Sequence, residues 1–379
     1  MPAAAQIDRQ HMQRALTLAR AAVGLASPNP TVGCVLAHGD RVVGEGAHRY
    51  DARDHAEVVA LRTAGSNAHG ATAYVTLEPC SHTGRTGPCA AALISSGISR
   101  VVIATADPNP LVAGRGISCM RAAGLTVDVG LCEREARALN NAFARFIQSA
   151  QPFVTLKSAL SADGFLAPPP ATRVPGQTVW LTGEDSRARV HLLRHAADAL
   201  LTGIGTVLAD DPALTDRSGL KRRRPLLRVI LDSTLRLPLD SLLVTISRDD
   251  LLVLCSPAAV ASREQALAAR GVQIARIPTL ADGSLDLRAA LALLAARQIT
   301  SVLAESGPAL NSALLRAQLV DELILFHSPV LLGAGSIPFA NGFTPAALES
   351  QLLHPTRQRL DDDLCVTGLL RDPWPNHPR

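Results

Sequence analysis

Four side chains between residues 55 and 89 have the types and spacing of a catalytic metal site. His55, Cys80 and Cys89 offer one imidazole and two thiols, and zinc binds both kinds of ligand. A catalytic zinc typically has three protein ligands and keeps a further position for water. Glu57 follows His55 closely, where a carboxylate can accept and deliver protons. The sequence therefore predicts a zinc site with Glu57 as its acid–base group.

Two alternatives use the same residues without catalysis. In the first, His48 or His82 completes a structural zinc site as a fourth ligand. In the second, His55 is a buried histidine beside unrelated cysteines. The spacing of the residues favours the catalytic site, because the glutamate and both Pro-Cys pairs accompany the three ligands.

The order His-x-Glu, Pro-Cys and Cys is typical of zinc deaminases, which attack a ring carbon of a nucleobase. The commonest form is Pro-Cys-x-x-Cys. Here the segment 81–88 separates Cys80 from Cys89, so the second thiol comes later than in that form.

Alternating strands and helices must position these residues. Apolar spacing predicts strands at 31–37, 41–46, 71–77, 101–105 and 126–129. Helices are expected at 12–23, after Asp54 as N-cap, at 89–96, at 119–123 and at 133–147. This order predicts an α/β layer sandwich, with the metal ligands at the starts of helices that follow strands.

The length of 379 residues predicts two domains, 1–150 and 151–379, with the boundary at Gln151-Pro152. Strands are expected at 153–160, 226–231, 251–255, 272–277, 301–304 and 323–328, and helices at 184–197, 261–269 and 285–297. The proline-rich tail 372–379 is expected to be disordered.

Composition narrows the class of protein. The net charge of +4 and the aromatic content of 3% do not indicate a nucleic-acid surface. We expect no secretory segment and no membrane span, because the N-terminus lacks a basic start and no apolar run is long enough. Seven scattered cysteines are typical of a reducing cytoplasm.

Three glycine-containing turns in the second half could face a phosphate group. They are Gly203-x-Gly205-Thr206, Ser306-Gly307 at a predicted helix start, and 332–335. None has the Gly-x-Gly-x-x-Gly spacing of a Rossmann site. The residues by themselves indicate a nucleotide-binding α/β domain or ordinary turns.

Several motifs of the first half resemble the deaminase half of the bacterial bifunctional riboflavin-biosynthesis deaminase/reductases. They are Pro28-Asn29-Pro30-Thr31-Val32-Gly33, His55-Ala56-Glu57, Glu78-Pro79-Cys80-Ser81-His82, Gly84-Arg85-Thr86, Pro88-Cys89 and Asp107-Pro108-Asn109-Pro110. The resemblance implies a cytidine-deaminase-like three-layer α/β/α domain. It implies zinc on His55, Cys80 and Cys89, proton transfer by Glu57, and contact of Asn29 with the pyrimidine.

The second half resembles the reductase half of the same family, which is similar in fold to dihydrofolate reductase and uses NADPH. The motifs include Lys157 to Gly164, Thr202 to Thr206, Leu208 to Thr215 and Glu305-x-Gly307-Pro308. The implied NADPH contacts are Leu160, Thr178, Trp180, Thr206, Asp210, Ser233, Gly307, Pro308, Ala309, Leu310, Asn311, Ser312 and Ala313. The implied substrate contacts are Arg194, Leu214, Arg217 and Glu305. Lys157 and Asp210 are candidates for proton movement.

The resemblance implies deamination of 2,5-diamino-6-ribosylamino-4(3H)-pyrimidinone 5′-phosphate, followed by NADPH-dependent reduction of the ribosyl chain. It also implies a dimer or tetramer formed through the reductase half. Two other classes stay open. A tRNA-type zinc deaminase with an accessory domain would need a basic, aromatic-bearing surface. A zinc-stabilised binding module would need a fourth protein ligand.

Overall fold

The computed structural model describes residues 3–82, 87–110, 112–172 and 179–374. The chain forms two compact units, and the main division between them falls after Ala150. The first unit consists of residues 1–150 with 221–223 and 373–379, and the second of 151–220 with 224–372.

The first unit is built on a five-stranded sheet with the order β2-β1-β3-β4-β5. Strand β1 is antiparallel to β2 and β3, whereas β3, β4 and β5 are parallel. The strands are β1 (Gly33–His38), β2 (Arg41–Ala47), β3 (Thr72–Val75), β4 (Arg100–Ile103) and β5 (Thr126–Val129). The helices are α1 (Ala3–Ala21), α2 (Ala56–Ala64), α3 (Cys89–Ser95), α4 (Arg115–Ala122), α5 (Glu133–Leu139) and α6 (Asn141–Ser149), with short 3-10 turns at Tyr50–Ala52 and Gly65–Ala68.

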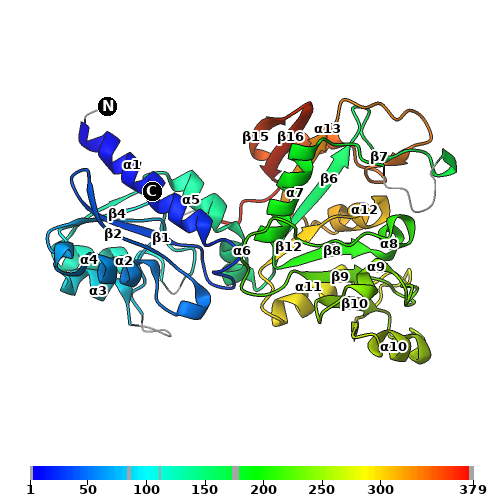
Figure 1. The fold of residues 1–379 in the computed structure, drawn as a ribbon, viewed down its shortest axis with the longest axis horizontal. Helices are drawn as coiled ribbons and strands as arrows, with labels where there is room; N and C mark the ends of the chain where they lie inside the picture. Colours follow the sequence, from blue (N-terminus) through cyan, green and yellow to red (C-terminus); the bar gives the residue numbers. More distant parts are fainter. Residues whose placement is uncertain (1–2, 83–86, 111, 173–178, 375–379) are drawn as a thin grey trace. The chain divides into compact units, whose positions relative to one another are not determined.

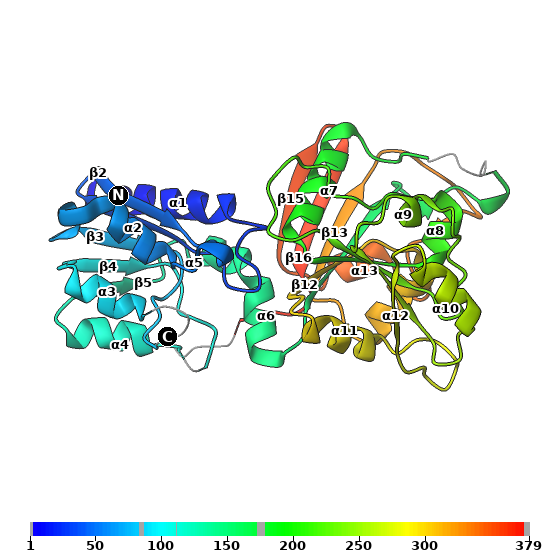
Figure 2. The ribbon, with the colours of Figure 1, turned by 60° about the horizontal axis from the view of Figure 1, so that its bottom comes forward.

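Helices cover both faces of this sheet, as a three-layer sandwich requires. One apolar cluster joins α2, α3 and α4 to one face, and another joins α1 and α5 to the opposite face. Figures 1 and 2 show the two groups of helices on either side of the strands. The predicted layer order of the first unit is confirmed.

Two glycines of β2 allow α2 to lie very close to the sheet. A Cβ atom on Gly44 would lie 2.3 Å from the carbonyl oxygen of Ala60, and one on Gly46 would lie 2.2 Å from that of Ala56. Both distances are far below van der Waals contact, so no larger residue fits without moving the helix. The position of α2, which begins beside His55, therefore depends on Gly44 and Gly46.

The helix predicted at 133–147 is in fact two helices, so that prediction is wrong. Asn140 separates α5 from α6 and has non-helical φ and ψ angles of −123° and 16°. Its side chain accepts a hydrogen bond from the Thr31 amide at 2.7 Å and donates one to the Thr31 carbonyl at 3.0 Å. This long-range pair takes the place of helix continuation and anchors the loop that contains Asn29.

The second unit is built on a nine-stranded sheet with the order β11-β10-β9-β8-β12-β6-β13-β16-β15. The seven strands from β11 to β13 are parallel to their neighbours, and β16 and β15 add an antiparallel edge. The strands are β6 (Phe153–Leu160), β8 (Ala199–Gly203), β9 (Leu227–Leu231), β10 (Leu251–Cys255), β11 (Gln273–Arg276), β12 (Ser301–Ala304), β13 (Glu322–His327), β15 (Leu353–Leu360) and β16 (Asp363–Leu369). A separate pair is formed by β7 (Phe165–Ala167) and β14 (Ile337–Pro338).

Helices cover both faces of the larger sheet as well. They are α7 (Glu184–Ala196), α8 (Ile204–Asp210), α9 (Leu242–Thr245), α10 (Ala261–Ala268), α11 (Leu287–Ala296), α12 (Pro308–Arg316) and α13 (Pro345–Glu349), and a 3-10 turn spans Pro170–Thr172. The apolar residues of α11, α12 and α13 pack on one face, and those of α7, α8, α9 and α10 on the other. Figure 2 shows α7 on the opposite side of the sheet from α11 and α12.

The tail predicted to be disordered at 372–379 is partly ordered. Trp374 is 6% exposed and packs in the apolar core of the first unit. Its indole N–H donates to the side chain of Asn141 at 2.9 Å, and the guanidinium of Arg137 lies 5.2 Å from its ring centre. The prediction is therefore wrong for Trp374, and residues 375–379 lie outside the described residues.

Within the described ranges, no helix combines the length and the apolar character needed to cross a lipid bilayer.

We predict that Gly46→Ala destabilises the first unit by about 1–3 kcal/mol, the usual cost of overpacking. The added methyl group would meet the backbone of α2 at Ala56. Urea unfolding of the purified protein measures the change. Gly205→Ala is the control, because a Cβ there meets no atom within 4 Å. Equal stability of the two variants would contradict the role assigned to Gly46.

Candidate functional site

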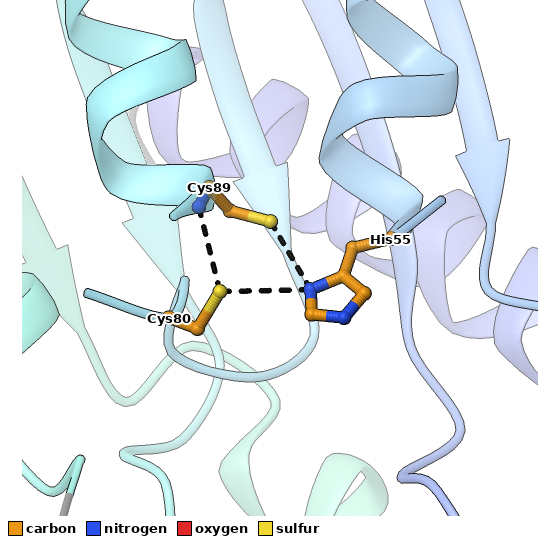
Figure 3. A group of neighbouring side chains, drawn as sticks. All are labelled: His55, Cys80 and Cys89. Atoms are coloured by element: carbon orange, nitrogen blue, oxygen red, sulfur yellow. Dashed lines mark hydrogen bonds between the residues drawn. The ribbon is translucent and has the colours of Figure 1, made fainter. Parts of the chain in front are cut away.

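Three segments of the first unit bring His55, Cys80 and Cys89 together (Figure 3). His55 is the N-cap residue of α2, Cys80 lies in the loop after β3, and Cys89 is the first residue of α3. The Nδ1 atom of His55 lies 3.6 Å from the Sγ atom of Cys80 and 3.2 Å from that of Cys89. The amide of Cys89 also donates to the Sγ atom of Cys80 at 3.4 Å. The ligand atoms are all within 4.8 Å of one another.

This arrangement fits zinc. With typical Zn–N and Zn–S bonds, nitrogen and sulfur ligands of a tetrahedral ion lie roughly 3.6 Å apart. The observed separations of 3.6 Å and 3.2 Å are close to that spacing. Among the residues that the structure describes, His55, Cys80 and Cys89 form the group with metal-binding geometry. Three ligands, rather than four, are typical of a catalytic site.

The two candidates for a fourth ligand are placed elsewhere. Both ring nitrogens of His48 make hydrogen bonds, to the side-chain nitrogen of Asn29 at 3.0 Å and to the Asp54 carbonyl at 2.9 Å. His82 is exposed and does not belong to the metal-binding group. A structural four-ligand site is therefore not supported. The ring of His48 lies edge-on to that of His55, so the bonded pair places Asn29 near the metal ligands.

Asp54 is not the N-cap of α2, contrary to the sequence prediction. The cap position is occupied by His55, with extended φ and ψ angles of −77° and 162°. The carboxylate of Asp54 pairs with Arg62, and its carbonyl accepts the hydrogen bond from His48. The helix therefore begins directly after the metal ligand and carries Glu57 in its first turn.

Glu57 is buried beside the three ligands. Its residue exposure is 3%, and burial raises the pKa of its carboxyl group to about 7. Glu57 also interacts electrostatically with His55, Cys80 and Cys89. A carboxyl group with a pKa near neutrality can both accept and donate a proton, which is what general acid–base catalysis requires.

The two cysteines influence each other's ionisation. A hydrogen bond between their side chains lowers the pKa of Cys80 and raises that of Cys89. Because only thiolates bind metal, both sulfurs would hold zinc in the deprotonated form.

In the second unit, candidate residues gather at one edge of the sheet. Leu160 ends β6, Thr206 follows β8, Ser233 follows β9, and Glu305 follows β12. These four strands are neighbours in the sheet and parallel, so their carboxyl ends share one edge. Ligands of open α/β sheets bind at this edge.

A buried ion cluster lies at the same edge. Arg194 of α7 binds Glu305 through two hydrogen bonds, from Nε to Oε1 at 2.7 Å and from Nη2 to Oε2 at 2.9 Å. The ammonium group of Lys157 lies 3.5 Å from Oε2 of Glu305. Burial alone would raise the pKa of Glu305, but Lys157 and Arg194 hold it at about 2. The cluster carries a net positive charge, which suits an anionic ligand.

Helix α12 has a free N-terminus at this edge. Gly307 is its N-cap residue, has no capping side chain, and a Cβ there would meet no atom within 4 Å. The amides of the first turn can therefore approach a phosphate group. The side chains of Asn311 and Ser312 bond within the fold, to the Phe339 carbonyl and the Pro308 carbonyl.

The remaining candidates differ in exposure. Trp180 is 63% exposed, with the guanidinium of Arg187 at 5.2 Å from its ring centre. Asp210 is the last residue of α8, and Arg217 is exposed. Leu214 is 6% exposed. Pro308, Ala309, Leu310 and Ala313 lie on α12, whereas Thr178 lies outside the described residues.

Two histidines near the ion cluster of Arg194, Glu305 and Lys157 were not predicted from the sequence. The side chain of His195 bonds to Asp216 at 3.1 Å, and Nδ1 of His191 accepts the amide of Arg217 at 3.3 Å. Both histidines share a face of α7 with Arg194. Their helical spacing was the available signal, but their partners lie in a loop distant in sequence.

Comparison with known proteins matches each unit to a protein family. Residues 5–105 match the cytidine and deoxycytidylate deaminase zinc-binding region, and residues 152–361 match the RibD C-terminal domain. The riboflavin biosynthesis protein RibD of Aquifex aeolicus is 40% identical over 330 residues, which cover 87% of this chain and 89% of that protein. The RibD protein of Escherichia coli is 42% identical over 338 residues, covering 86% and 89%.

Solved structures agree with these matches. RibD of Acinetobacter baumannii has a TM-score of 0.79 at 38% identity, and covers 96% of this chain and 99% of its own. The diaminohydroxyphosphoribosylaminopyrimidine deaminase/5-amino-6-(5-phosphoribosylamino)uracil reductase of Thermotoga maritima has a TM-score of 0.80 at 33% identity, with the same coverage. The expected deaminase-like and reductase-like folds are confirmed.

We predict that Cys89→Ser abolishes stoichiometric zinc binding, because a serine hydroxyl does not replace a thiolate ligand. Metal analysis of the purified variant measures this loss. Cys119→Ser is the control, since Cys119 is exposed and lies outside the metal-binding group. Retention of zinc by the Cys89 variant would indicate a different ligand set.

From the lowered pKa of Glu305 we predict that the folded protein loses stability in acid. Its folded-state pKa of about 2 lies below the ordinary value of 4.5, so its contribution is full above pH 4.5 and declines as the pH falls toward 2. The shift corresponds to about 3 kcal/mol, of which about 2 kcal/mol is lost by pH 3. Urea unfolding of the wild type between pH 5 and pH 3 should show this loss.

The variant Glu305→Gln should lack this part of the pH dependence. Glu264→Gln is the matched control, because Glu264 forms a more exposed ion pair with Arg276 and should leave the wild-type pH profile unchanged. Identical pH profiles for the wild type and Glu305→Gln would contradict the assignment.

Proposed function

The chain belongs to the RibD family of riboflavin-biosynthesis enzymes, and we propose that its two units act in succession on one phosphoribosylated pyrimidine. It is a bifunctional deaminase/reductase, with a zinc-binding deaminase domain and a RibD-type reductase domain. The first reaction is hydrolytic deamination of 2,5-diamino-6-ribosylamino-4(3H)-pyrimidinone 5′-phosphate. The second is reduction of the ribosyl chain of 5-amino-6-(5-phosphoribosylamino)uracil.

One observation carries the proposal for the first unit: a three-ligand metal site with a buried carboxyl group beside it. His55, Cys80 and Cys89 would hold zinc, which lowers the pKa of a bound water from about 16 toward about 7. Glu57 accepts one proton from the attacking water and delivers it to the ring nitrogen. It then transfers the remaining proton of the added hydroxyl group to the amino group, which leaves as ammonia. Its pKa of about 7 allows both directions of transfer.

Asn29 is proposed to bind the edge of the pyrimidine. Its side-chain nitrogen is held by His48 at 3.0 Å, and this bond restrains the side chain close to His55. The other end of its loop is fixed by the Thr31–Asn140 pair. A loop fixed at both places can orient a ring for attack at one carbon.

For the second unit, we propose that the shared strand edge binds NADPH, which supplies a hydride for the reduction. Open space beside Gly205 and Gly307, together with the free amides at the start of α12, fits the phosphate groups of such a cofactor. The proposed contacts are Leu160, Thr178, Trp180, Thr206, Asp210, Ser233 and the segment 307–313.

The substrate of the second unit is proposed to meet Arg194, Leu214, Arg217 and Glu305. Glu305 holds the guanidinium of Arg194 in one orientation and leaves Lys157 at the edge of the cluster. Lys157 is the candidate for delivering a proton to the opening sugar ring, because it is the cation that Glu305 holds less tightly.

The alternative of a tRNA-type deaminase is not adopted. It leaves residues 152–361 without a role, whereas the RibD family accounts for them. Free thiols at all seven cysteines suit a reducing compartment, and we propose a cytoplasmic location on that ground. A dimer or tetramer formed through the second unit stays a prediction.

Incubation of the purified protein with the diaminopyrimidine substrate, zinc and NADPH tests the proposal. We expect ammonia release followed by NADPH oxidation. Glu57→Gln should lower the rate of ammonia release at least about a thousandfold, since it removes the proton carrier of the reaction. It should retain zinc and still reduce a substrate that has already been deaminated.

The pre-deaminated substrate separates the two activities in each variant. If Glu57→Gln lost zinc or folded structure, Glu57 would be structural rather than catalytic. If the wild type released no ammonia and oxidised no NADPH, the proposed function would be wrong.

A further inference from the structure

Glu78 is a buried carboxylate next to the metal site. It follows β3 closely, precedes Cys80 by two positions, and is 3% exposed. Its Oε2 atom accepts hydrogen bonds from the amides of Asp107 at 3.1 Å and Gly114 at 2.9 Å. Its Oε1 atom accepts from the amides of Gly116 at 2.9 Å and Ile117 at 3.2 Å. Four backbone amides therefore balance this charge.

These amides explain why the carboxylate is tolerated without a cation. In the part of the chain that the structure describes, the ion pairs do not include Glu78. A buried charge is costly unless it is fully hydrogen-bonded, and bonds to a charged acceptor are the strong ones. The position of the four amides is therefore tied to this one side chain.

Glu78 also acts as the cap of α4. The N-cap residue of this helix is Gly114, which has a left-handed φ of 77° and no side chain to cap the first turn. Gly116 and Ile117 lie in that turn, where amides have no partner within the helix. Glu78 supplies the missing acceptor from another segment, and its negative charge suits the positive end of the helix dipole.

The first turn of α4 lies directly against the segment that carries Cys80. A Cβ atom on Gly116 would be only 2.0 Å from the carbonyl oxygen of Pro79. The amide of Glu78 donates to the Thr105 carbonyl at 3.0 Å, so the start of the 105–117 segment is held as well. The approach of α4 to the metal site therefore requires both Glu78 and Gly116.

The segment held by Glu78 begins close to a metal ligand. Asp107 is 7% exposed, its carboxylate accepts the Asn109 amide at 2.8 Å, and it interacts electrostatically with Cys80. A substrate beside the metal ligands would therefore meet the loop that starts at Asp107. A change in the position of this loop would alter substrate binding without removing a metal ligand.

We propose that Glu78 is a positioning residue of the deaminase, which fixes the loop that starts at Asp107 and the first turn of α4 against the segment carrying Cys80. Through this loop it sets the shape of the substrate pocket. The inference rests on the deaminase activity proposed above. Glu78 itself touches neither the metal nor the substrate.

The variant Glu78→Gln tests this role. The glutamine nitrogen cannot accept hydrogen bonds, so two of the four amides lose their acceptor. We expect the KM for deamination to rise about tenfold, which corresponds to about 1.4 kcal/mol, because two of the four amides keep their acceptor and the loop stays partly anchored. The kcat should change much less, and zinc content and reduction of the pre-deaminated substrate should equal those of the wild type.

Gly116→Ala provides a second test without any change in charge. Its methyl group would push the first turn of α4 away from Pro79, so the KM should rise in the same way. Glu133→Gln is the matched control, because Glu133 is partly exposed, lies in the same unit and pairs with Arg137 along its own helix. Its kinetic constants should equal those of the wild type.

Wild-type KM in both Glu78→Gln and Gly116→Ala would overturn the inference. Loss of zinc, or a fall in kcat with an unchanged KM, would also overturn it, because Glu78 would then act through the metal site. If Glu78→Gln failed to fold, the KM of Gly116→Ala would decide whether the inference holds. Absence of ammonia release from the wild type would instead refute the proposed function.

Discussion

The close packing of α2 on β2 is the constraint on which the deaminase site depends. His55 and Glu57 belong to the start of this helix, whereas Cys80 lies in the loop after β3 and Cys89 begins α3. The ligand atoms can meet only if α2 lies at one particular depth over the sheet. Gly44 and Gly46 allow that depth because the carbonyl groups of the helix occupy the space of their missing side chains. A metal site assembled from three segments thus depends on residues that do not touch the metal.

The two units show how surroundings set the role of one residue type. Burial raises the pKa of Glu57 to about 7, so that it can exchange protons. Two cations hold the pKa of Glu305 at about 2, so that it remains a charged partner for Arg194 and Lys157. Glu78 is buried as well, but backbone amides surround it. One side chain can therefore carry protons, orient an arginine or cap a helix, according to what it contacts.

Parallel strands explain the organisation of the second unit. The strands β9, β8, β12 and β6 are neighbours, and each ends at the same edge of the sheet. Candidate residues that are far apart in the sequence, such as Leu160 and Glu305, are brought to one place by this topology. The free N-terminus of α12 adds unpaired amides there without any charged side chain.

The sequence by itself was enough to determine the class of fold and to predict the metal ligands, the acid–base residue, the domain boundary and most strands. These depend on residue type and on local spacing, which are visible without a fold. Only the tertiary structure decided the break at Asn140, the burial of Trp374 and the capping of α4 by Glu78. Each of these is a hydrogen bond or packing contact between residues distant in sequence, where local propensity carries no information. The same reason explains why the partners of Glu305 could not be read from the sequence, although the residue itself could.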